Sequence, residues 1–128
     1  MSKYSTLDLK YDSSILNKSL IFPIITKSKD DIKSGDLILV KTPTRKLFGL
    51  VIDRQDTPLS ALSLEFLRVL TYTPNTKPVK TKQDAYKFMK HYAGIGKNTI
   101  VQLLWIMKMS WNEGMRKAKE LEEVISYE

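Results

Sequence analysis

Two glycines in close succession, Gly94 and Gly96, interrupt the most regular apolar pattern in this chain. Ahead of them, apolar side chains recur every three or four residues over residues 85–92, which is the spacing of one face of an amphipathic helix. Behind them, the same spacing recurs over residues 100–107. The pattern therefore predicts two short helices joined by a tight turn. The first is expected over about residues 82–92, and the second from about residue 98 to residue 111.

The predicted turn has the composition of a phosphate-binding loop. The backbone N–H groups of Gly94, Gly96 and Lys97 can face a phosphate oxygen in such a turn, and the lysine adds a positive charge. Lys87 and Lys90 stand on the preceding helix and belong to the same candidate nucleic-acid-binding set. The alternative is a glycine that only ends the first helix, followed by the N-cap of the next one, with no ligand.

Residues 85–108 resemble the helix-hairpin-helix motif of DNA-binding proteins that do not read sequence, whose core is a hydrophobic-glycine-hydrophobic-glycine hairpin. The resemblance implies that Ile95 holds the hairpin between the two helices while the glycines approach the phosphate backbone. Two features depart from the motif. Ala93 stands where the family usually has a proline, and one copy is visible where many members carry a pair.

Positive charge is concentrated in the same part of the chain. The formal net charge is +7, and residues 76–119 hold ten lysines and arginines against two acidic residues. The segment after residue 119 carries four glutamates and no basic residue. A basic block around the glycine turn favours an anionic partner. The alternative is a lysine-rich surface that only keeps the protein soluble.

Residues 32–72 are predicted to form a small antiparallel β domain. Turn-forming residues separate three β-prone runs, which cover residues 37–41, 47–54 and 66–72. The pattern resembles the small SH3-like barrels of phage-type accessory proteins, with Gly49 at a bend. Arg45 and Lys46 lie on the second turn beside Phe48, where basic loops can contact a nucleic-acid backbone. The alternative there is a charged turn with no ligand.

The first 30 residues are expected to form an extended arm. They contain many apolar side chains, but Pro23 cannot donate a hydrogen bond inside a sheet, so an edge strand or an arm is favoured. We expect this arm to pack along the open edge of the β domain or across a subunit boundary, with Phe22 among its partner contacts. Trp111 and Met115 can form a second partner-binding patch, although packing in the core is the default for such side chains.

Nothing in the sequence indicates an enzyme or a cofactor. There is no cysteine and a single histidine, His91, so a metal site of three or four ligands is not expected. The turn also fails the nucleotide-binding pattern G-x-x-x-x-G-K-[ST], because Asn98 follows the lysine. No secretory signal or membrane-spanning apolar run is visible, which favours a cytoplasmic location without membrane contact, in the host cytoplasm or the virion if the protein is phage-encoded.

We therefore expect an α+β protein with an arm (1–30), a small β domain (31–75) and a helical hairpin with a terminal helix (76–128). The favoured function is a non-enzymatic, basic accessory protein that binds nucleic acid through its phosphate backbone, with DNA and RNA both open. The chain is small, rich in lysine and free of cysteine, with an N-terminal arm, and in these features it also resembles phage-encoded proteins. The alternative function is therefore a structural component of a phage particle or another assembly, in which the arm and the C-terminal helix hold a homo-oligomer or other virion subunits. A third option is a regulator that binds a host protein.

Overall fold

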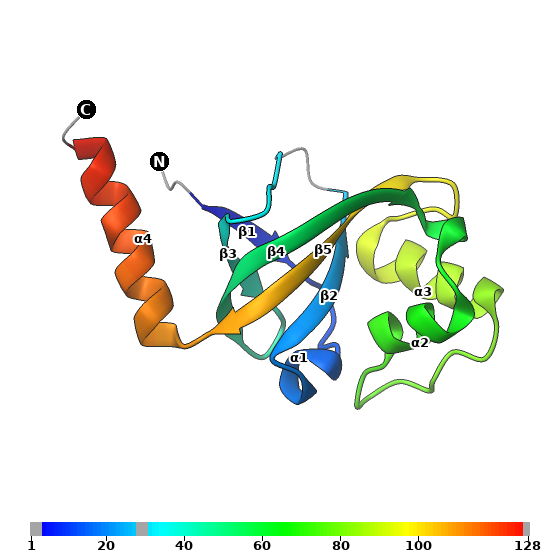
Figure 1. Cartoon of the computed structure of the whole chain (residues 1–128). Helices are drawn as coiled ribbons and strands as arrows, with labels where there is room; N and C mark the ends of the chain where they lie inside the picture. Colours follow the sequence, from blue (N-terminus) through cyan, green and yellow to red (C-terminus); the bar gives the residue numbers. More distant parts are fainter. Residues whose placement is uncertain (1–3, 28–30, 127–128) are drawn as a thin grey trace.

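Five strands form one mixed sheet in the order β1-β3-β4-β5-β2 (Figure 1). The computed structural model describes residues 4–27 and 31–126. The strands are β1 (Ser5–Asp8), β2 (Ile21–Thr26), β3 (Leu37–Lys41), β4 (Lys46–Pro58) and β5 (Ile100–Met109). The helices are α1 (Ile15–Lys18), α2 (Leu64–Thr71), α3 (Lys82–Ala93) and α4 (Trp111–Ser126), with a short 3-10 turn, η1 (Leu59–Ala61), after β4. The protein is thus α+β, as predicted.

The N-terminal segment is part of the sheet and supplies both of its edges. β1 pairs in parallel with β3, and β2 pairs antiparallel with β5. Pro23 lies in β2, an edge strand of the sheet, so of the two predicted alternatives, an edge strand or an extended arm, the edge strand is confirmed. Phe22 has no exposed surface and packs in the core. The prediction that Phe22 contacts a partner is therefore wrong.

Residues 100–109 form a strand, and the predicted second helix of the hairpin is wrong. β5 is covered on both faces, so buried residues such as Leu103 and Leu104 follow one another without strict alternation. A short apolar run of this kind has no period that separates a strand from a helix. The 13-residue strand β4 pairs with the whole of β5 through its residues Phe48 to Pro58, and this long-range pairing decides the conformation. The helix pair expected over residues 85–108 is therefore a helix followed by a strand.

The third predicted strand, residues 66–72, is also wrong, because most of it belongs to α2. Ser63 caps this helix, and its hydroxyl accepts a hydrogen bond of 3.2 Å from the Phe66 N–H. Leu67 and Leu70 then face the core three residues apart, while Phe66 packs edge to face on Trp105 of β5. The apolar spacing of α2 is helical, and its cap was visible in the sequence.

The helices cover opposite ends of the sheet (Figure 1). At one end, α2 and α3 pack on the first half of β5, where Leu67, Met89 and Leu103 belong to one buried cluster. At the other end, α4 lies against β3 and β4, with Ala118 in a cluster with Leu39. Between these layers, a core on one face of the sheet includes residues of all five strands and Leu16 of α1. No described helix is both long and apolar enough to cross a membrane.

Candidate nucleic-acid interface

Four of the predicted nucleic-acid-binding residues come together on one surface. They line a shallow depression of about 550 Å³ on α3 and the turn that follows it, which we call the α3 depression. Its lining residues are Tyr86, Lys87, Lys90, His91, Gly96 and Lys97. The sequence interpretation missed Tyr86 and His91 as members of this surface. Their helical spacing from Lys87 and Lys90 is the signal that could have found them.

The local sequence explains why α3 presents these side chains to the solvent. Thr81 caps the helix, and its hydroxyl accepts a hydrogen bond of 3.1 Å from the Asp84 N–H. Ala85 and Met89 lie four residues apart and are fully buried against α2 and β5. The lysines and the histidine therefore fall on the opposite face of the same helix.

Gly94 ends α3 and does not present its N–H to a ligand. Its φ of 66° places it in the left-handed region, and its N–H donates to the Lys90 carbonyl. The next N–H, from Ile95, donates to the Met89 carbonyl, and the Ile95 side chain is buried. This arrangement is a helix C-cap, as the first part of the alternative expected, but a strand follows it and not the N-cap of a second helix. The proposal that its N–H faces a phosphate is wrong.

The N–H of Gly96 is also occupied. It donates to the hydroxyl of Thr99 at 3.2 Å, while the Thr99 N–H donates to the Gly96 carbonyl. The Lys97 carbonyl accepts a hydrogen bond of 2.8 Å from the Ser60 N–H, which fastens the turn to η1. The turn is therefore a rigid connection from helix to strand. Of the three N–H groups of the predicted phosphate loop, only that of Lys97 makes no hydrogen bond within the described residues, so an anion can meet this N–H and the exposed Lys97 side chain.

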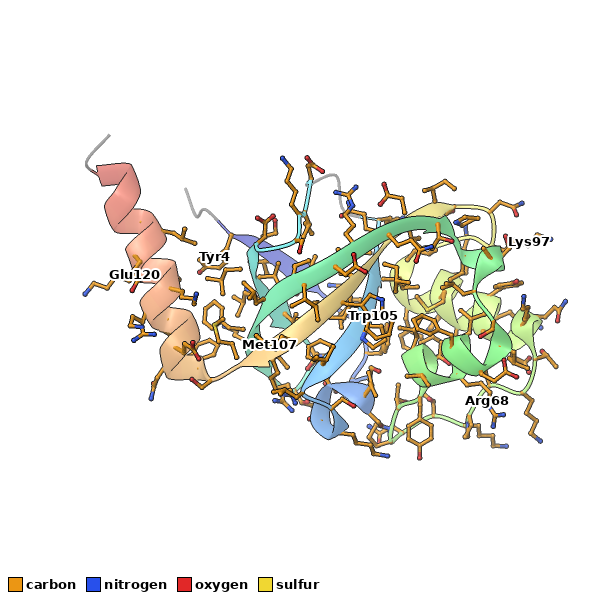
Figure 2. All side chains as sticks on the ribbon, viewed as in Figure 1. Tyr4, Arg68, Lys97, Trp105, Met107 and Glu120 are labelled. Carbon is orange, nitrogen blue, oxygen red and sulfur yellow. The ribbon has the colours of Figure 1, made fainter. Side chains whose placement is uncertain are left out.

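The lysines that line the α3 depression lie in a part of the chain with an excess of positive charge. Residues 59–99, which connect β4 to β5, contain seven lysines and arginines against two acidic residues. Figure 2 shows Lys97 and Arg68 on this helical end of the molecule and Glu120 at the other end, on α4. Within the part of the chain that the structure describes, the ion pairs join Arg54 to Asp31 and Asp56, and Lys33 to Asp31. The lysines of the α3 depression therefore keep their charge unneutralised.

Arg45 and Lys46 do not belong to this surface. Both are exposed at the turn between β3 and β4, and neither lines the α3 depression. The Arg45 guanidinium donates to the side-chain oxygen of Asn17, in α1. Lys108 lies partly buried in β5, and its pKa is lowered, first by burial and then by the charge of Arg45. These cations are a separate group at another place on the sheet.

Trp111 and Met115 occupy the first turns of α4, at the end of the sheet away from α3 (Figure 1). Their exposed fractions are 46 % and 48 %. The Trp111 ring packs against Phe48 of β4, with ring centroids 4.8 Å apart. One side of the indole is thus held by the sheet, and the other side remains accessible.

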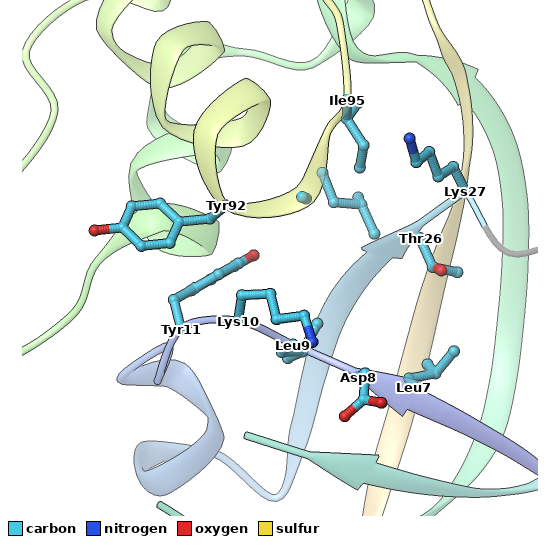
Figure 3. Close-up of a pocket in the computed structure, with 11 residues that line it drawn as sticks. Leu7, Asp8, Leu9, Lys10, Tyr11, Thr26, Lys27, Tyr92 and Ile95 are labelled. Atoms are coloured by element: carbon cyan, nitrogen blue, oxygen red, sulfur yellow. The ribbon is translucent and has the colours of Figure 1, made fainter. Parts of the chain in front are cut away.

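A pocket of about 230 Å³ lies where the chain after β1 approaches the end of β2 and α3. Figure 3 shows Tyr11 and Tyr92 on one side of it and Lys27 on the other. The Lys27 ammonium is already bound to the carbonyl of Gly94. Burial raises the pKa of Tyr11 to about 12, so its phenol is neutral over the physiological range. Among the described residues, no cluster of three or more histidine, cysteine or acidic side chains forms a metal site.

No family model matches the chain. No match is found among the curated proteins, and none among the solved structures.

Proposed function

We propose that this protein is a non-enzymatic nucleic-acid-binding protein that holds the phosphate backbone at the α3 depression. The observation that carries this proposal is the convergence of Lys87, Lys90 and Lys97 on one open surface without a neutralising carboxylate among the described residues. Phosphates bind such exposed ammonium groups by releasing condensed counterions. The lysines act as point charges, so contacts of this kind position a strand without reading its sequence.

The shape and composition of the depression favour a strand over a small anion. It is wide and shallow, whereas a small ligand is usually enclosed by its site. The partly buried ring of Tyr86 lies in the same surface, and aromatic rings next to basic groups stack on unpaired bases. We therefore propose that single strands bind at least as well as duplexes.

Fluorescence anisotropy with a labelled single strand and two unrelated duplexes tests this proposal. The test variant carries alanine at Lys87, Lys90 and Lys97. The control variant has the same change of net charge on α4, at the other end of the sheet, and carries alanine at Arg116, Lys117 and Lys119. We expect the test variant to lose at least about tenfold in affinity at low salt while the control stays close to the parent. Equal losses in both variants would show that binding follows net charge alone.

A second function, a component of a particle or another assembly, is favoured by one observation. α4 presents the half-exposed side chains of Trp111 and Met115 next to each other on its first turns, and aromatic and methionine side chains are frequent in interfaces. The N-terminal segment is no longer part of this proposal, because it forms two strands of its own sheet. Light scattering of the parent and of a Trp111→Ala, Met115→Ser variant tests it, with loss of oligomers expected.

The resemblance to SH3-like barrels stays part of the proposal only for the antiparallel pair β3–β4, because residues 66–72, the third expected strand, belong mostly to α2. Gly49, the residue expected at a bend, lies in β4 between Ile38 of β3 and Lys108 of β5. A side chain at Gly49 would meet Ile106 of β5 at 2.3 Å, so the two strands approach closely there.

A further inference from the structure

A groove between α1 and α2 has a different chemistry from the α3 depression. It has a volume of about 340 Å³ and is lined mainly by apolar atoms. We call it the α1–α2 groove, and its lining residues are Ser14, Ile15, Lys18, Arg68, Val69 and Tyr72. It shares no residue with the α3 depression.

The two walls of the α1–α2 groove are fixed to each other. The N–H of Ser14, the N-cap of α1, donates a hydrogen bond of 2.8 Å to the carbonyl of Tyr72, the C-cap of α2. The Lys18 ammonium lies over the Tyr72 ring, 5.2 Å from its centroid. Leu16 and Leu70, on the inner sides of the same helices, are buried. The groove is therefore formed before any ligand arrives, which lowers the cost of binding.

The apolar part of the groove is open to solvent, and its charged groups have one sign. Val69 and Tyr72 expose 41 % and 43 % of their surface. Lys18 stands in the last turn of α1 and Arg68 in the last turn of α2. Among the described residues, no carboxylate forms an ion pair with either cation. An occupant that complements this surface has apolar side chains next to carboxylates.

We propose that the α1–α2 groove docks a short acidic, amphipathic segment of a partner protein. Its apolar side chains would cover Val69 and Tyr72, and its carboxylates would pair with Lys18 and with the fork of Arg68 donors. A small molecule fits less well, because pockets for such ligands bury most of the ligand surface and this groove is open along its side. The proposal does not depend on nucleic-acid binding, which uses other residues.

Selection from a library of random linear peptides displayed on phage tests the proposal. Phage are selected on the parent protein, and those that also bind a Val69→Asp variant are removed. We expect the remaining peptides to combine aspartate or glutamate with aromatic or aliphatic residues. In anisotropy with one such labelled peptide, a Lys18→Glu, Arg68→Glu variant should bind at least about tenfold more weakly. The same peptide with lysine in place of its acidic residues should then prefer this variant.

The matched control is a Lys87→Glu, Lys90→Glu variant, which has the same change of net charge in the α3 depression. All four substituted side chains are exposed, so circular dichroism and urea unfolding should show the parent fold in both variants. The control should keep the affinity of the parent for the peptide. Enrichment of basic or uncharged peptides, equal losses in both variants, or no peptide that depends on Val69 would overturn the proposal. Binding of anionic vesicles without peptide binding would also overturn it.

Discussion

The ammonium of Lys27, one residue beyond the end of β2, donates a hydrogen bond of 2.9 Å to the carbonyl of Gly94, the C-cap of α3. These residues are 67 positions apart in the chain. The bond brings a positive charge to the C-terminal end of a helix, where the free carbonyls and the helix dipole favour it. It also fixes the end of α3, and with it the α3 depression, to the edge strand that the N-terminal segment supplies.

We expect Lys27→Met to lower the free energy of unfolding by about 0.5–1 kcal/mol, because an exposed charge at a helix end contributes about that much. Urea unfolding measured by circular dichroism gives the value. Lys87→Met is the control, since it removes an exposed lysine that has no such bond, and it should leave the midpoint almost unchanged. The difference between the two variants should shrink at high salt. Equal effects would mean that the bond contributes nothing.

Alanine substitutions at the two glycines of the turn should give opposite results. Gly94 has a φ of 66°, so a side chain there is strained, and we expect Gly94→Ala to cost about 1 kcal/mol of stability. Gly96 does not have a positive φ, and the nearest atom to an added Cβ is the Thr99 hydroxyl oxygen at 3.4 Å. Gly96→Ala should therefore change the stability by less than about 0.5 kcal/mol. Thermal unfolding of both variants checks the pair.

The sequence predicted α3 closely because its signals are local. Its cap at Thr81, its buried face at Ala85 and Met89, and its glycine stop at Gly94 all lie within one short segment. The same reasoning brought Lys87, Lys90 and Lys97 into one candidate site, since helix geometry and a short turn hold them together. Local patterns of this kind are readable because no distant part of the chain has to be known.

The conformation of β5 could not be read in this way. Its apolar residues match a helical period as well as a buried strand, and the decision comes from pairing with β4 and β2, which are distant in sequence. The parallel pairing of β1 with β3 is equally non-local. The α1–α2 groove was missed for the same reason, because its walls come from segments about fifty residues apart that meet only in the folded chain.

Gly114 lies in α4 directly over the ring of Phe48, and an added Cβ would stand 2.3 Å from that ring. Alanine is favoured over glycine by about 1 kcal/mol in a helix, but overpacking costs about 1–3 kcal/mol. We therefore expect Gly114→Ala to destabilise the protein, although Asn112→Ala, at an exposed position of the same helix, should not. In a Phe48→Leu background the cost of Gly114→Ala should fall. A double-mutant cycle from urea unfolding measures this coupling.

The salt dependence of nucleic-acid binding should report the number of lysines that contact phosphate. For the parent protein, a plot of log affinity against log salt should have a negative slope with a magnitude of about three or more, because each phosphate contact contributes about one unit. Removing Lys87, Lys90 and Lys97 together should reduce this slope by about three, and each single alanine variant by about one. A variant that weakens binding at every salt concentration without a change of slope would mean that its lysine acts through the fold.

We expect the protein to lose stability in alkaline solution because Tyr11 is buried. Its phenol is buried, packs edge to face on Phe88, and has a pKa raised to about 12 in the folded protein from 10. Because burial favours the neutral phenol, its contribution is fully present below pH 10 and is lost as the pH rises from 10 through 12. A shift of two pKa units corresponds to about 2–3 kcal/mol. Urea unfolding between pH 9 and pH 12 should show this loss. A Tyr11→Phe variant should lose less stability over the same range, because phenylalanine does not ionise. If parent and variant lose stability in parallel, Tyr11 does not titrate in the unfolding equilibrium.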